Sequence, residues 1–116
     1  MRDAWLELDV TLKQRIRTVL EDPERLVTEA ELRKLSEEGR GLTLILRAEL
    51  QRLEQRLGEL DADPLTSLSD IAPAFRRVHD FREHLVELDS LLSALHDRAR
   101  VVRTSRLLGS KLRPLE

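Results

Sequence analysis

A seven-residue apolar repeat over residues 71–102 constrains the fold of this chain more than any other feature. Two positions of every heptad are apolar, and they hold Ile71, Ala74, Val78, Phe81, Leu85, Leu88, Leu92, Leu95, Ala99 and Val102. Residues three and four apart lie on one face of an α-helix, so this spacing predicts a long helix with a continuous apolar seam. Other helices, from the same chain or from another chain, must cover that seam.

The composition also favours an all-α protein. Of the 116 residues, 41% are hydrophobic, 36% are charged and only 3% are aromatic, which is typical of long helices and coiled coils. The chain has no Cys, which excludes disulfides, thiol catalysis and thiolate metal sites. The longest apolar run, residues 44–46, is far shorter than the ~20 residues of a membrane span, and the acidic start does not resemble a signal peptide. We therefore expect a soluble, cytoplasmic protein.

Local signals predict three helices in a single domain, residues 1–116. The first covers residues 3–20, with an apolar stripe formed by Trp5, Leu8, Leu12, Ile16 and Val19. The second begins either at Pro23, capped by Asp22, or after Thr28, which forms a capping box with Glu31. It continues to about residue 60, with a kink at residues 39–41, where two glycines lie. After a loop at residues 61–69 the third helix covers residues 70–107, capped by Asp70, and a basic tail follows at 108–116.

These lengths predict an antiparallel helical hairpin with a shorter N-terminal helix, either a three-helix bundle or a coiled-coil-like fold. The first helix is half as long as the others, so one end of the hairpin lacks a third helix. We predict that a second copy of the chain, or another helical protein, covers the apolar side chains there and completes a four-helix bundle. The predicted interface comprises Leu42, Ile45, Leu46, Leu50, Leu53, Leu57, Phe75, Val78, Phe81 and Leu85. The alternative is a monomer in which the second helix breaks at residues 39–41 and folds back.

Positive charge is concentrated near the C-terminus, although the net charge is −2. Residues 98–113 contain no acid and six basic residues, Arg98, Arg100, Arg103, Arg106, Lys111 and Arg113. A basic helix of this kind contacts phosphates through charge, which makes nucleic acid a candidate partner. We favour internal pairing with the acidic start of the second helix, Glu29, Glu31, Glu37 and Glu38.

The sequence predicts no catalytic residue, metal site, cofactor or small-molecule substrate. The three histidines lack metal-ligand spacing, and no glycine-rich phosphate loop follows a strand. Arg77 and His84, with six residues between them, resemble the Arg–His motif of the helical HEPN ribonucleases, although Val78 stands where that motif is usually polar. The resemblance implies a dimeric helical ribonuclease whose catalytic residues are Arg77 and His84.

Taken together, the residues favour a non-enzymatic helical module for protein–protein interaction and assembly. The first alternative is a small nucleic-acid-associated protein that acts through residues 98–113. The second is the ribonuclease-like enzyme that uses Arg77 and His84.

Overall fold

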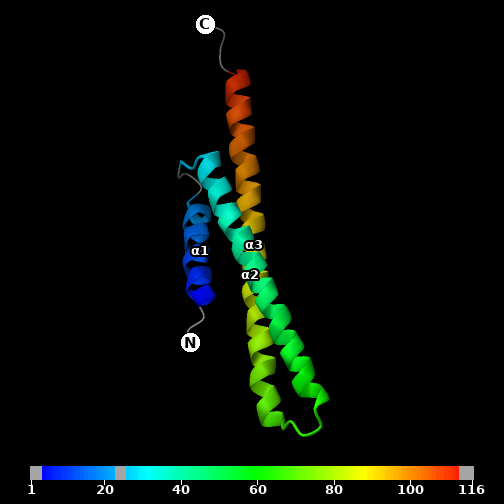
Figure 1. Cartoon of the computed structure of the whole chain (residues 1–116). Coiled ribbons are helices and arrows are strands. Elements are labelled where there is room, and N and C mark those ends of the chain that lie inside the picture. The colour runs from blue at the N-terminus through cyan, green and yellow to red at the C-terminus, as the bar shows by residue number, and fades with distance from the viewer. Residues whose placement is uncertain (1–3, 23–25, 113–116) are drawn as a thin grey trace.

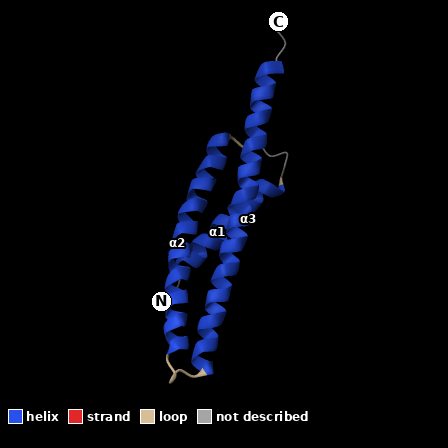
Figure 2. Ribbon diagram, turned by 90° about the vertical axis from the view of Figure 1, so that its right-hand side faces the viewer, coloured by secondary structure: helices blue, strands red, loops and turns tan. Residues whose placement is uncertain are grey.

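The computed structural model describes residues 4–22 and 26–112, and shows three helices in this part of the chain (Figure 1). They are α1 (Ala4–Glu21), α2 (Glu29–Ala62) and α3 (Leu68–Leu112). Two views show α2 and α3 running side by side in opposite directions, joined by a short loop at one end (Figures 1 and 2). α1 packs against both near the middle of the molecule. The predicted all-α fold with three packed helices is confirmed.

The ends of α2 follow the local signals in the sequence. Thr28 is the N-cap, and its side-chain oxygen accepts a hydrogen bond from the backbone N–H of Glu31 at 3.1 Å. α2 therefore begins at the second of the two predicted starts, because residues 26–28 are not helical; Pro23 itself lies outside the described residues. Beyond the other end of α2, the Asp63 carboxylate accepts from the N–H of Leu65 at 2.9 Å and turns the chain towards α3.

α2 is unbroken across residues 39–41, which excludes the fold-back alternative in this structure. Gly39 is buried against α3, and a Cβ atom built on it would lie 2.3 Å from Leu92 Cδ2. Gly41 faces open space. The first glycine therefore allows α2 and α3 to approach closely, whereas the second has no such role.

The apolar seam of α3 forms the centre of the core. All ten heptad positions from Ile71 to Val102 are buried or half-buried. They meet the apolar leucines of α2. Those of its first half, Leu32, Leu35, Leu42 and Leu46, are buried, whereas those that continue the stripe, Leu50, Leu53, Leu57 and Leu60, are only half-buried. The buried core of the three helices consists of Leu12, Ile16, Val19, Leu32, Leu35, Leu42, Leu46, Phe81, Leu85, Leu88 and Leu95.

α1 packs with the apolar stripe that the sequence predicts, except at Leu8. Leu8 is exposed, whereas its neighbour Asp9 is only 1% exposed and Lys13 only 2% exposed. The prediction for Leu8 was wrong because Asp9 and Lys13, four residues apart, neutralise each other at 2.9 Å and so tolerate burial against α3.

α3 is longer than predicted at both ends. It begins at Leu68, where the carbonyl of Ser67 accepts from the N–H groups of Asp70 and Ile71, so Asp70 lies in the first turn and is not the cap. It continues through Gly109 to Leu112, because a single exposed glycine costs a helix only ~1 kcal/mol. The molecule is consequently elongated, with dimensions of 81 × 22 × 18 Å.

Candidate functional site

The ten residues of the predicted interface fall into two groups. Half of them are already buried within the chain, namely Leu42, Leu46, Val78, Phe81 and Leu85. Trp5 of α1 covers Phe81, with their ring centroids 4.1 Å apart, so α1 reaches further along α3 than the helix lengths predicted. The others remain accessible to a partner: Leu50, Leu53 and Leu57 are half-buried, and Ile45 and Phe75 are exposed.

Among the described residues, the end of the molecule beyond α1 contains only α2 and α3. We call it the loop end and define it as residues 47–78. Its inner surface is formed by the half-buried Leu50, Leu53, Leu57 and Ile71. The loop end also carries three exposed large apolar side chains, of which Leu65 is 92% and Leu68 83% exposed, and Phe75 is the third. A large exposed apolar patch marks a site of interaction, so this end of the molecule is a candidate interface.

A second apolar surface lies between α1 and α2. It is a groove of about 440 Å³ whose lining includes Leu8, Leu12, Gly41, Leu42 and Ile45. An ion pair between Arg15 and Glu38, 2.7 Å apart, crosses from α1 to α2 beside it. Sequence periodicity missed this groove because it placed Leu8 in the core.

A polar cluster connects α1 to α3. Asp9 Oδ2 lies 2.9 Å from Lys13 Nζ and 3.2 Å from His84 Nδ1, while Oδ1 of the same carboxylate has no hydrogen-bond partner among the described residues. Lys13 also lies 3.5 Å from Glu87 Oε1, which accepts a hydrogen bond from Arg17. Burial alone would raise the pKa of Glu87, but the hydrogen bond from Arg17 and the charges of Lys13 and Arg17 outweigh it and lower that pKa below its ordinary value.

The basic segment is partly paired with α2, as the sequence favoured. Arg106 lies 3.2 Å and Arg103 3.9 Å from the Glu29 carboxylate. Glu38 pairs with Arg15 of α1 and not with α3. Arg98 is half-buried, and Arg100 lines a groove between α2 and α3. The side chain of Lys111 and the whole of Arg113 lie outside the described residues.

Arg77 and His84 contact different neighbours. The Arg77 guanidinium lies 5.9 Å above the centre of the Phe81 ring, whereas His84 Nδ1 faces Asp9 and Lys13. The ribonuclease-like alternative stays a prediction. No group of three His, Asp or Glu side chains within the described ranges is placed to hold a metal ion.

Comparison with models of known protein families, with curated proteins and with solved structures found no match to this chain. Within residues 4–22 and 26–112, no helix combines the length and the apolar character that crossing a membrane requires.

Proposed function

We propose that this protein is a homotypic assembly module and that the loop end binds the loop end of a second copy. The observation that carries the proposal is that α1 does not lie along the loop end, so that no third helix among the described residues covers the apolar inner surface of α2 and α3 there. Leu50, Leu53 and Leu57 are half-buried there, although residues in the same stripe beside α1 are buried. Two helices from a second copy would supply the missing cover and form a local four-helix bundle.

The size of the exposed surface supports an additional partner. The chain exposes 8809 Å², about 2,300 Å² more than the ~6,500 Å² expected for a compact monomer of this mass. Its radius of gyration is 20.2 Å, compared with about 13 Å for a compact domain of this length. A stable interface covers about 800 Å² on each partner, so the excess is large enough to supply one.

Charge at the loop end favours a second copy over a strongly charged partner. Basic and acidic side chains alternate around it, including Arg52 with Glu49 at 2.7 Å and Arg56 with Glu59 at 4.0 Å. A surface of both signs can complement itself after a two-fold rotation, whereas it gives no net attraction to a uniformly acidic or basic protein.

The proposal predicts a concentration-dependent dimer that a charge at Phe75 disrupts. The wild-type mass, measured by light scattering during size exclusion, should approach twice 13.4 kDa as the concentration rises. Phe75→Glu places a carboxylate on the interface and should weaken dimerisation at least about tenfold, since burying one Phe is worth ~1.5–3 kcal/mol. Helix content, measured by circular dichroism, should not change, because Phe75 is already exposed.

Val101 provides a matched control on the same helix. It is 60% exposed, compared with 58% for Phe75, but lies towards the opposite end of α3. Val101→Glu should leave the dimer intact. A wild-type chain that stays monomeric at every concentration, or equal weakening by both variants, would show that the loop end is not the interface.

A further inference from the structure

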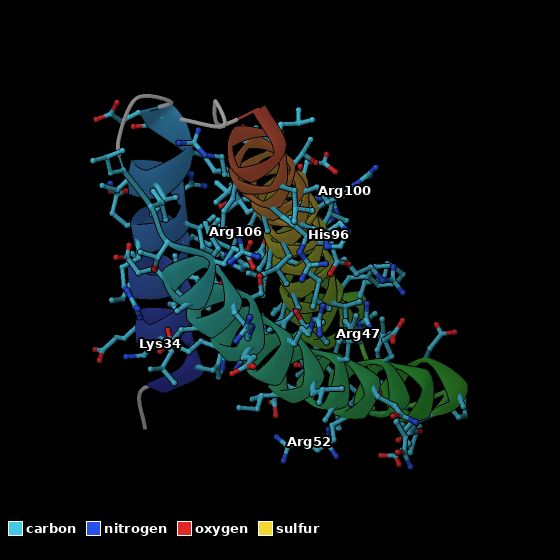
Figure 3. The ribbon with its side chains drawn as sticks, turned by 90° about the horizontal axis from the view of Figure 1, so that it is seen from above. Lys34, Arg47, Arg52, His96, Arg100 and Arg106 are labelled. Atoms are coloured by element: carbon cyan, nitrogen blue, oxygen red, sulfur yellow. The ribbon has the colours of Figure 1, made fainter. Side chains whose placement is uncertain are left out.

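A groove between the first half of α2 and the second half of α3 concentrates positive charge. It has a volume of about 380 Å³ and is lined on one side by residues of α2, namely Glu29, Arg33, Ser36, Glu37 and Arg40. His96 and Arg100 line its other side, and both project from α3 on the side away from α1 (Figure 3). Arg103 closes the groove towards the end of α3.

Three arginines of this groove form no ion pair within the described part of the chain. Elsewhere along the same two helices, Arg47 lies 3.6 Å from Asp89, and Arg82 pairs with Glu54. By contrast, no carboxylate among the described residues pairs with Arg33, Arg40 or Arg100. Glu29, which lies at the Arg103 end of the groove, already forms ion pairs with Arg103 and Arg106. The groove thus holds three arginines without an ion pair to a described residue, although Glu37 also lines it.

The close packing of α2 and α3 brings the two rows of cations to one groove. Gly39 lies against Leu92, so the helix backbones approach closely between Arg40 and His96. Arg33 and Arg40 are seven residues apart on α2, which spaces them about 10 Å along the groove. His96 and Arg100, one helical turn apart, face them from α3. A single phosphate cannot span this length, whereas a row of two or three phosphates can.

We propose that the groove binds an oligophosphate, a short anion with two or three adjacent phosphate groups. Guanidinium groups donate paired hydrogen bonds to phosphate oxygens, and the Ser36 hydroxyl can donate another. A short anion fits better than a long nucleic acid, because the chain carries a net charge of −2 and acids such as Glu37 and Asp97 border the cations. This site is separate from the loop end and does not depend on assembly.

Isothermal titration calorimetry of the full chain with inorganic tripolyphosphate at low salt tests the proposal by measuring the binding affinity. We expect saturable binding that weakens as salt is added, and binding of inorganic orthophosphate that is at least about tenfold weaker.

The double variant R33Q/R100Q should weaken tripolyphosphate binding by about tenfold or more. The control R52Q/R56Q removes the same charge from the second half of α2 and should change the affinity less than about twofold. Glu37→Gln should strengthen binding.

Three results would overturn the proposal. The first is the absence of saturable tripolyphosphate binding at low salt. The second is equal weakening by R33Q/R100Q and R52Q/R56Q, which would indicate attraction to overall charge and not to the groove. The third is binding of a single-stranded RNA oligonucleotide without binding of tripolyphosphate, which would assign the groove to nucleic acid. Light scattering on the same samples keeps this test distinct from assembly, because R33Q/R100Q should retain the wild-type mass.

Discussion

At the residue scale, two glycines of the same helix have opposite consequences. Both were predicted to weaken or kink α2, since glycine disfavours helix interiors. The helix continues through both, and only Gly39 has a neighbour that explains its presence. A sequence identifies such glycines but cannot tell them apart, because the difference lies in Leu92, which is more than fifty residues away in the chain.

Alanine substitution at the two glycines should therefore change stability in opposite directions. Gly41→Ala should raise the free energy of unfolding by about 0.5–1 kcal/mol, because the helix gains propensity and no atom lies in the way. Gly39→Ala should lower it by about 1–2 kcal/mol, since Leu92 must move. Urea denaturation measures both values. The loss in Gly39→Ala should shrink when Leu92 is also replaced by Ala, and an additive double variant would contradict the proposed contact.

The ionised Glu87 carboxylate should make the stability of the fold depend on pH in the acidic range. Its pKa is lowered below the ordinary 4.5 by Arg17 and Lys13, so its ionised form stabilises the fold above the ordinary pKa. That stabilisation is lost as the pH falls through the lower pKa of the folded state. Glu87→Gln should be less stable than wild type at neutral pH, by a small amount because the side chain is half exposed. The urea midpoints of the two proteins should converge in acid, and equal midpoints at neutral pH would contradict the assignment.

At the scale of elements, the sequence predicts that α1 is helical but not which residues at the edge of its apolar stripe are buried. The stripe from Trp5 to Val19 predicted a helix, and the helix is present. The stripe did not predict which flank faces α3, because Leu8 and Asp9 are adjacent and hydrophobicity alone favours Leu8. By contrast, all ten seam positions of α3 are buried or half-buried, because a heptad repeat of that length leaves no choice of face.

The Asp9–Lys13 pair should control how firmly α1 docks. Asp9→Asn leaves a buried Lys13 without its nearest counter-ion and should cost about 3 kcal/mol, because breaking a buried pair strands the other charge. The double variant D9L/K13M replaces both with apolar side chains and should recover most of that loss. Fluorescence of Trp5, the single Trp of the chain, reports docking because its ring lies against Phe81. A double variant no more stable than Asp9→Asn would argue against the pair as the cause.

At the scale of the whole molecule, three helices of 18, 34 and 45 residues cannot form one compact bundle. The sequence predicted this mismatch, and with it the loop end that lacks a third helix. It did not predict the groove between α2 and α3, because Arg33 and Arg40 belong to α2 whereas His96 and Arg100 belong to α3, and only the helix register brings them together. The proposed assembly surface and the proposed anion groove lie on different segments of the same two helices.

The repeating contact between α2 and α3 has an evolutionary consequence. Because their packing repeats every seven residues, inserting or deleting one heptad in both helices near the loop would move its tip by about 10 Å and keep the core register. The three-helix middle, where α1 covers Leu88 and its neighbours, would not change. The fold can therefore serve as a spacer, because evolution can change the length of its hairpin without changing its core.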